Sequence, residues 1–224
     1  MRRSTLFRAS AAGLACGLLA LVPAGQAQTL TVGNSPYEWG QGGEFNAVPH
    51  GFFQTPVSLT TDGTFQTFCV QSQVSITPGQ TYAAAFSMTA PGGPALNEQT
   101  AYLYDQFIRG VLPNYDYTNA SNSRQSDAGA LQYAIWQLEG QTTSGIGLQY
   151  NPLPSLTAEY VTLADTNAVA GDFYGVQIVV LQTTGPNPSN VQNLLAKVVP
   201  APSTAAMLGL GGLVAGRRRR SLPA

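Results

Sequence analysis

Few side chains in this sequence could carry out covalent or acid–base chemistry. The chain holds one histidine, His50, in a Pro49-His50-Gly51 turn, and no nucleophile motif surrounds any of its serines. We interpret His50 as a solvent-facing loop residue. One histidine and the cysteine Cys69 cannot form a zinc set without two well-placed carboxylates. Four aspartates lack EF-hand spacing and could bind calcium only through unpatterned loops: Asp62, Asp105, Asp116 and Asp127. We therefore expect no metal and no cofactor.

Cys69 and Gln132 stand in two segments that together are informative. Cys69 lies in Thr-Phe-Cys-Val-Gln on a predicted strand, and Gln132 lies in Leu-Gln-Tyr-Ala-Ile-Trp on a predicted helix. An aromatic-Cys-aliphatic segment followed by apolar-Gln-x-Ala-Ile-Trp resembles the thioester domains of Gram-positive surface adhesins and of related PEP-CTERM proteins. The resemblance extends from about residue 65 to residue 181 and includes the helical segment 102–107. It implies an internal thioester between the Cys69 sulfur and the side-chain carbonyl of Gln132.

The chemistry of such a bond is consistent with these residue types. A thiolate can expel ammonia from a primary amide when a rigid strand and helix hold the two groups at attack distance. A lysine amine or a sugar hydroxyl could then attack the acyl carbon, which would release the Cys69 thiol and leave the target bonded to Gln132. Phe68, Tyr133 and Trp136 are expected to shield the bond from water. In the alternative interpretation, Cys69 is a small buried apolar residue and Gln132 is solvated on an amphipathic helix.

The surrounding pattern predicts a mainly β to α+β body. Short β-prone runs alternate with turn residues such as Asp62-Gly63 and Pro78-Gly79. The predicted strands are residues 30–32, 51–53, 57–59, 65–70, 74–76, 82–88, 174–181 and 193–199, and the last is expected to pair with the one before it. We expect a β-sandwich or a barrel-like body with two or three inserted helices.

Three segments change to a helical period. Residues 96–110 place apolar side chains at helical spacing, with Gly110 near the end. A second helix is expected to begin at a Ser126 cap and end at Gly140, with a stripe formed by Leu131, Ala134, Ile135 and Leu138. Residues 156–168 predict a third helix.

The N-terminal end has the pattern of a cleaved secretion signal. Arg2, Arg3 and Arg8 precede an apolar run over residues 11–22 that is too short to span a bilayer comfortably, and Gly-Gln-Ala ends at Ala27. We expect cleavage after Ala27, which removes Cys16 and leaves Cys69 without a partner for an internal disulfide.

The C-terminal end has the pattern of a membrane anchor. A short Pro-rich motif precedes an apolar Gly- and Leu-rich run over residues 205–216, and four arginines follow that resist crossing the bilayer. Residues 200–220 resemble the PEP-CTERM sorting tail of exopolysaccharide-producing bacteria, although Ala201 replaces the glutamate of that family. The resemblance implies processing by an exosortase. Its sorting motif would comprise Pro200, Pro202, Ser203, Thr204, Arg217, Arg218, Arg219 and Arg220.

These features divide the chain into a signal peptide (1–27), a thioester-domain-like body (28–199) and a sorting tail (200–224). Seven of the ten Lys and Arg residues lie in the two ends, so the body keeps Arg109, Arg124 and Lys197 against eleven acidic residues, a net charge of −8. This charge disfavours nucleic-acid binding.

Two functions are expected for such a protein at the cell envelope, where the tail either tethers it or releases it to the extracellular matrix. The first is covalent adhesion through the thioester to a surface-protein amine or a polysaccharide hydroxyl, as a single-use binder and not an enzyme. The second is a structural or non-covalent carbohydrate-binding matrix protein.

Overall fold

Seven antiparallel strands form the body of the protein. The computed structural model describes residues 28–40, 42–52, 54–93, 95–143 and 150–199, so the predicted signal and sorting tail lie outside the described residues. The main sheet has the order β5-β9-β8-β7-β1-β4-β6. Its strands are β1 (Thr29–Gly33), β4 (Phe45–His50), β5 (Thr55–Pro56), β6 (Phe65–Thr67), β7 (Thr81–Ser87), β8 (Val176–Gln182) and β9 (Leu194–Val199). A small hairpin is made of β2 (Glu38–Trp39) and β3 (Gly42–Gly43).

The sheet curls into a nearly closed barrel because the chain that follows β6 meets β9. Cys69 pairs with Leu194 in an isolated antiparallel bridge. The flanking hydrogen bonds run from the Leu195 amide to the Phe68 carbonyl (3.1 Å) and from the Val70 amide to the Asn193 carbonyl (2.9 Å). We call this junction the barrel seam. The barrel-like alternative of the predicted fold is therefore the one observed.

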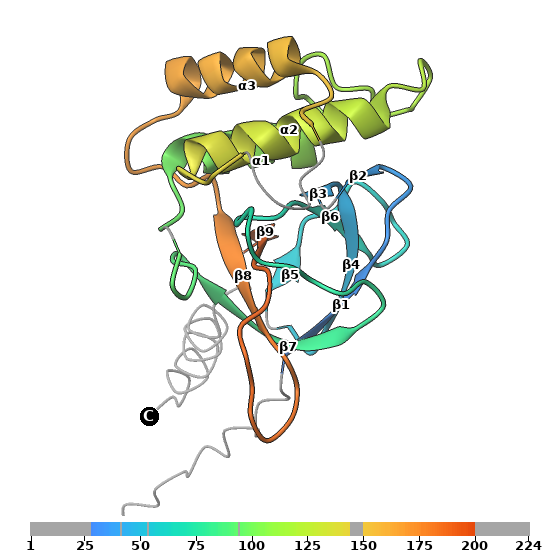
Figure 1. Cartoon of the computed structure of the whole chain (residues 1–224), viewed down its shortest axis with the longest axis vertical. Helices are drawn as coiled ribbons and strands as arrows, with labels where there is room; N and C mark the ends of the chain where they lie inside the picture. Colours follow the sequence, from blue (N-terminus) through green and yellow to red (C-terminus); the bar gives the residue numbers. More distant parts are fainter. Residues whose placement is uncertain (1–27, 41, 53, 94, 144–149, 200–224) are drawn as a thin grey trace, which may run out of the picture.

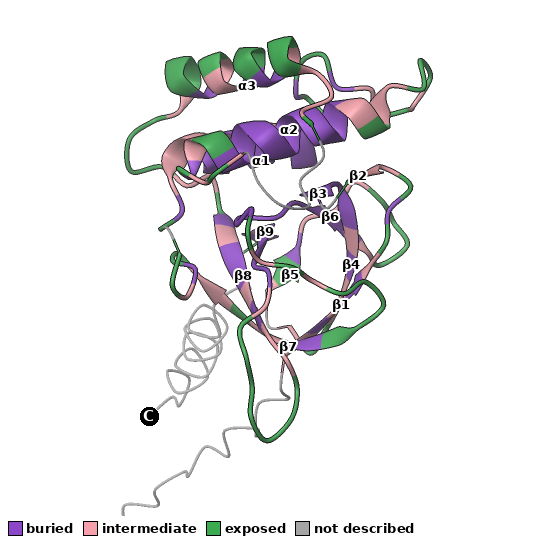
Figure 2. Cartoon of the chain, in the orientation of Figure 1, coloured by how far each residue is buried: buried purple, intermediate pink, exposed green. Residues whose placement is uncertain are grey.

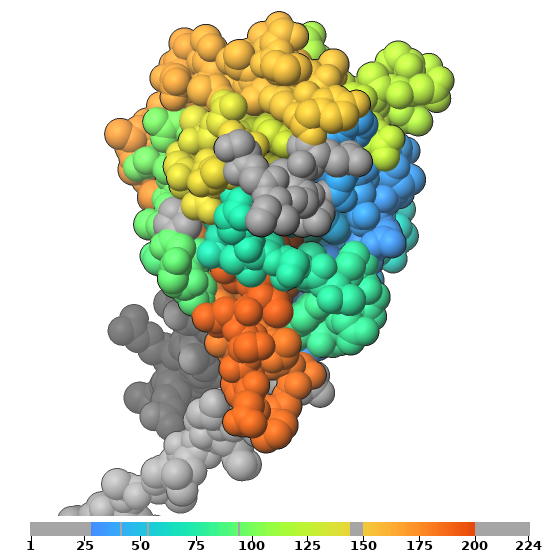
Figure 3. All heavy atoms as spheres, in the orientation of Figure 1, coloured from blue at the N-terminus to red at the C-terminus, as the bar shows by residue number. Residues whose placement is uncertain are grey.

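Three helices lie together at one end of the barrel (Figure 1). They are α1 (Glu98–Ile108), α2 (Arg124–Leu138) and α3 (Pro154–Asn167). Asn97 begins α1, because its side chain accepts a hydrogen bond from the Thr100 amide (2.7 Å). Pro154 stands in the first turn of α3, where a missing N–H is tolerated. The connection between β8 and β9 projects from the opposite end of the molecule (Figure 3).

The helix α2 lies between α3 and the barrel, so it is buried on more than one side (Figure 2). Every residue from Asp127 to Trp136 is buried. On the α3 side, the Thr157 hydroxyl donates to the Ala130 carbonyl (3.0 Å). On the barrel side, Tyr133 and Trp136 join the cluster of barrel residues that includes Cys69. The predicted apolar stripe is present, but the polar positions between its members are buried as well.

Most predicted elements are confirmed, and several details are corrected. The three helices, β1, β6, β7, β8 and the β8–β9 pairing occur where the pattern placed them. Ser126 does not cap α2, because the helix already begins at Arg124, whose side chain pairs with Glu44. Gly140 follows the end of α2 with a φ of 64°, as expected for a glycine terminator.

Three predicted strands do not form where they were expected. Residues 57–59 lie in a loop in which the Ser58 hydroxyl donates to the Thr64 carbonyl (2.5 Å), a local bond that competes with strand pairing. The described part of 51–53 forms a bend after Gly51, which has a φ of 68°. Residues 74–76 are irregular and line a pocket.

The strand β4 was not predicted, because Pro49 lies within it. Prolines are confined to strand positions where their missing N–H leaves no gap in the pairing. Here β6 covers only Phe45 to Ala47 of β4, so β4 is an edge at Pro49 while β1 pairs along its other side.

Candidate functional site

The structure brings Cys69 and Gln132 together across 63 residues of sequence. The Cys69 amide donates to Gln132 Oε1 (2.9 Å), and Gln132 Nε2 donates to the Cys69 carbonyl (2.7 Å). Both residues are buried, with exposed fractions of 2 % and 1 %. The alternative interpretation expected Gln132 to be solvated on the helix surface, and the burial of its side chain contradicts this. The Gln132 amide lies directly against the cysteine backbone.

The barrel seam explains why the Cys69 backbone is free to bind this amide. Phe68 and Val70 use their backbone groups to pair with β9, so the alternation of an antiparallel ladder turns the amide and carbonyl of Cys69 away from β9. Buried backbone groups must find partners. The carboxamide of Gln132 supplies both a donor and an acceptor, and it acts as a substitute for a neighbouring strand.

The hairpin β2–β3 holds the Gln132 side chain from the other side. A Cβ atom at Gly42 would lie 2.8 Å from Gln132 Cγ and 2.9 Å from Trp136 Cη2, so only glycine fits at this contact. Glu44, the residue that follows the hairpin, forms an ion pair with Arg124 of α2 (Oε1 to Nη2, 2.8 Å), which helps to hold the hairpin on the helix. Gln132 is thus fixed by the seam, its own helix and the hairpin.

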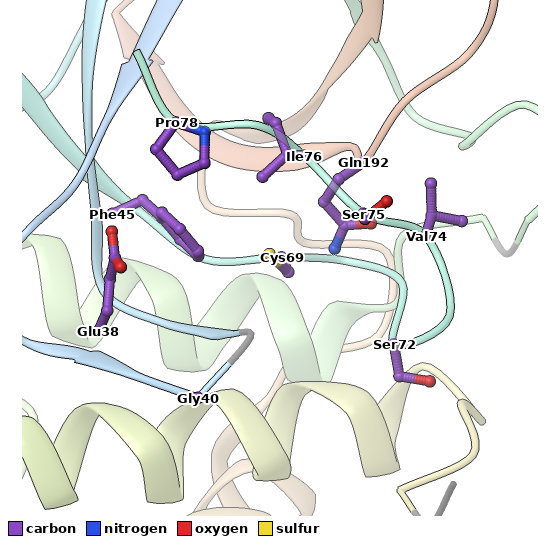
Figure 4. A pocket seen from close by; sticks show the side chains of 10 residues that line it. All are labelled: Glu38, Gly40, Phe45, Cys69, Ser72, Val74, Ser75, Ile76, Pro78 and Gln192. Atoms are coloured by element: carbon purple, nitrogen blue, oxygen red, sulfur yellow. The ribbon is translucent and has the colours of Figure 1, made fainter. Parts of the chain in front are cut away.

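A pocket of about 320 Å³ reaches Cys69 from outside the barrel (Figure 4). It lies between the hairpin and the segments on either side of the barrel seam. Its lining residues are Glu38, Gly40, Phe45, Cys69, Ser72, Val74, Ser75, Ile76, Pro78 and Gln192. The pocket gives a small molecule or a side chain a route to the Cys69 end of the site.

The electrostatics of this site keep the Cys69 thiol neutral. Burial raises its pKa to about 12, a hydrogen bond with the Gln192 side chain opposes that shift, and the negative charge of Glu38 adds to it. A thiol with such a pKa holds almost no thiolate at neutral pH. Chemistry at Cys69 therefore needs a group that takes the proton from sulfur or returns it.

Gln192 is a buried polar residue of the pocket that sequence reasoning missed. Its Nε2 donates to the Gln71 carbonyl (2.5 Å), whereas its Oε1 is buried without a hydrogen-bond partner in the described part of the chain. Gln71 in turn accepts a bond from Asn193 Nδ2 (2.7 Å). No local motif marks Gln192, because only the closure of the barrel seam brings it to Cys69.

The aromatic residues expected to shield the site divide into two groups. Tyr133 and Trp136 lie in the same buried cluster as Cys69, with their rings 5.4 Å apart. Phe68 belongs instead to the cluster under the helices, where its ring contacts Phe107 at 4.9 Å. Phe45 shares the cluster of Cys69 and lines the pocket, so it occupies a shielding position that the sequence did not indicate.

The remaining candidate residues lie apart from this site. His50 is exposed at the end of β4, with Nε2 3.0 Å from the Thr31 hydroxyl. Asp105 pairs with Arg109 and Lys197, and Asp127 accepts from the Asp116 amide. Within the described residues, no three His, Cys, Asp or Glu side chains form a group that could hold a metal ion.

No family model matches the chain, and no curated protein or solved structure matches it significantly. Among the helices of the described segments, none is long and apolar enough to cross a membrane.

Proposed function

We propose that this protein is an exported surface module that forms an internal thioester between Cys69 Sγ and Gln132 Cδ and uses it to attach covalently to a partner. The observation that supports this proposal most directly is the pair of reciprocal hydrogen bonds between the Gln132 carboxamide and the Cys69 backbone. These bonds hold a primary amide beside a buried thiol, which supports the pairing implied by the thioester-domain resemblance.

The proposed bond forms in one substitution. Cys69 Sγ attacks Gln132 Cδ, a C–S bond replaces the C–N bond, and the thiol proton leaves with the departing nitrogen as ammonia. Fixed geometry of this kind can raise the rate of an intramolecular reaction by many orders of magnitude. An external nucleophile later replaces sulfur on Cδ, which couples the partner to Gln132 and regenerates the Cys69 thiol. Each molecule reacts once, as a binder and not as a turnover enzyme.

The distribution of amines in the chain supports this function. Lys197 is the only lysine of the sequence, and its amine is paired with the carboxylate of Asp105. An amine held against a carboxylate in an ion pair is not free to approach an acyl carbon. The protein therefore lacks a free lysine that would consume a thioester on its own surface or on a neighbouring copy.

The termini complete the proposal. The signal-like segment would export the body, and the PEP-CTERM-like tail would be recognised by an exosortase and hold the body at the cell envelope or release it to the matrix. The covalent target would then be an amine of a surface protein or a hydroxyl of an extracellular polysaccharide.

Methylamine tests the proposed function directly. Incubation of the purified non-reduced protein should add methylamine at Gln132, located by peptide mapping, and release one thiol at Cys69. The Cys69→Ala variant is the matched control, because it removes sulfur but keeps both backbone hydrogen bonds to Gln132. If wild type and control behave alike, the function is wrong.

One observation favours a non-covalent carbohydrate-binding function as the second candidate. Tyr150 is 74 % exposed, and its ring contacts Trp39 edge to face at 5.8 Å. Exposed aromatic faces are common stacking surfaces for sugars. This candidate would be supported if the wild-type protein binds an extracellular polysaccharide, Tyr150→Ala abolishes that binding, and Cys69→Ala leaves it intact.

A further inference from the structure

The pocket beside Cys69 contains two polar groups that the thioester itself does not use. The Glu38 carboxyl projects from β2, and its Oε1 accepts a hydrogen bond from the Ser35 amide (3.1 Å). Gln192 Oε1 is buried and unpartnered among the described residues. A buried acceptor without a donor is costly, so Gln192 Oε1 is available to a donor that enters the pocket.

The two groups lie on opposite sides of Cys69 (Figure 4). Glu38 belongs to the hairpin that packs on α2, and Gln192 belongs to the segment that leads into β9. Glu38 and Cys69 line the same pocket, and the negative charge of Glu38 contributes to the raised pKa of the Cys69 thiol. A nucleophile that enters the pocket would therefore reach the Cys69 end of the proposed bond in a space that is also lined by a carboxylate and an amide side chain.

We propose that Glu38 is the proton carrier of this site: it accepts the proton of the attacking nucleophile and delivers it to the departing sulfur of Cys69. This inference rests on the proposed thioester. It assigns a catalytic role in bond opening to a residue that the motif does not contain.

The step balances without any further reactant. For a primary amine, nitrogen bonds to Gln132 Cδ, the C–S bond breaks, one N–H proton passes to the Glu38 carboxylate, and that proton then passes to the Cys69 thiolate. The products are a secondary amide, a neutral thiol and an ionised Glu38. Gln192 Oε1 accepts the second N–H of the amine and orients it.

The electrostatics of the site support this role. A thiol whose pKa lies at about 12 is a poor leaving group as a thiolate, so opening is fast only if sulfur receives a proton. Burial raises the pKa of Glu38, with a smaller opposing effect from the Ser35 amide. A carboxylate with a raised pKa is a stronger base than an exposed one, which suits it to proton transfer.

The rate of methylamine addition tests the inference. Glu38→Gln keeps the size of the side chain and an acceptor for the Ser35 amide, yet it cannot carry a proton. We expect the variant to react at least about 100-fold more slowly, the lower end of the usual range for loss of a general base. Asp165→Asn, an exposed carboxylate of α3, is the control and should react like wild type. An unchanged rate in Glu38→Gln would overturn the inference.

A rescue experiment separates proton transfer from structural damage. In Glu38→Ala, added formate should restore a large part of the lost rate, because it can occupy the space of the missing carboxylate. If Glu38→Ala also forms the Cys69–Gln132 thioester slowly, formate should restore thioester formation, because the carboxylate then carries the proton from the Cys69 thiol to the departing ammonia. A loss that formate does not restore would contradict the relay and leave Glu38 a structural residue.

The intact mass and the rate of methylamine addition separate a missing thioester from a missing relay. If the wild-type mass lacks the ammonia deficit, the thioester and the relay both fail. If wild type carries the bond and Glu38→Gln reacts normally, only the relay fails.

Discussion

At the residue scale, the central feature is that one amide side chain completes the backbone pairing of a cysteine. Gln132 fills both hydrogen-bonding positions of Cys69 that the barrel seam leaves open. The same two bonds hold the reacting groups together, so stability of the site and its chemistry depend on one side chain. The sulfur of Cys69 does not take part in this pairing, which makes the two contributions separable by mutation.

Two alanine substitutions should separate the contribution of Gln132 to stability from the chemistry of the Cys69 sulfur. Gln132→Ala leaves the buried amide and the buried carbonyl of Cys69 unpaired, which costs about 1–3 kcal/mol for each group. Cys69→Ala keeps both bonds and loses only the packing of sulfur. We therefore expect Gln132→Ala to unfold at clearly lower denaturant concentration than Cys69→Ala, although neither variant reacts with methylamine. Equal stability of the two variants would contradict a stabilising role of Gln132 in the backbone pairing of Cys69.

The reactive pair could be predicted from sequence, but its environment could not. Short motifs mark Cys69 and Gln132, because the chemistry demands those residue types. Glu38 and Gln192 have no local motif, since a pocket is created only when the hairpin and the seam meet around Cys69. The burial of Gln132 was also out of reach, because it depends on α3 and the barrel covering two sides of α2.

At the element scale, the β2–β3 hairpin positions the reactive helix. Gly42 allows the hairpin to contact Gln132 and Trp136 closely. Glu44 follows the hairpin and pairs with Arg124, the first residue of α2. The Tyr115 hydroxyl also donates to the Glu44 carboxylate (2.8 Å). The Arg124 guanidinium lies 4.3 Å from the centre of the Tyr37 ring. Sequence periodicity located α2 but not this hairpin, whose strands are only two residues long.

Gly42→Ala should disturb the site without changing any reactive atom. The added methyl group would overlap Gln132 Cγ and Trp136 Cη2, and overpacking of this kind costs about 1–3 kcal/mol. We expect a lower fraction of molecules with the ammonia deficit, measured by intact mass. Gly33→Ala is the control, because its Cβ would meet only the Asn46 carbonyl at 3.6 Å. Full bond formation in Gly42→Ala would argue against hairpin control of Gln132.

Loss of the buried ion pair should destabilise the hairpin contact strongly. Arg124→Gln leaves the Glu44 carboxylate buried without its cation, a change that costs about 3 kcal/mol. Arg109→Gln is the matched control, because the Arg109 side chain is 56 % exposed and an exposed pair contributes less than about 1 kcal/mol. Denaturant unfolding measures both, and similar losses in the two variants would contradict this assignment.

At the scale of the whole molecule, the body combines strong negative charge with an almost complete lack of amines. Its three cations all lie in ion pairs, Arg109 and Lys197 with Asp105, and Arg124 with Glu44. This distribution would spare a thioester from self-reaction and leave it for an external nucleophile. Such composition is visible in the sequence, whereas the pairing of each cation follows only from the fold.

An amine placed at the pocket should therefore consume the bond. Ser75 is exposed and lines the same pocket as Cys69, so Ser75→Lys places an amine in the pocket that reaches the Cys69 end of the proposed bond. We expect the ammonia deficit to persist, because a Lys–Gln amide also loses ammonia, while methylamine no longer adds and the Cys69 thiol becomes free. Thr162→Lys on the exposed face of α3 is the control and should keep methylamine reactivity. A Ser75→Lys variant that still adds methylamine would show that the pocket does not lead to the bond.

The intact mass of the purified, non-reduced and untreated wild-type protein tests the central claim most directly. We predict a mass lower by one ammonia than the value calculated from the sequence of the isolated form, and a full calculated mass for Gln132→Ala. A wild-type protein of full calculated mass with a titratable Cys69 thiol would contradict the thioester and the covalent function built on it.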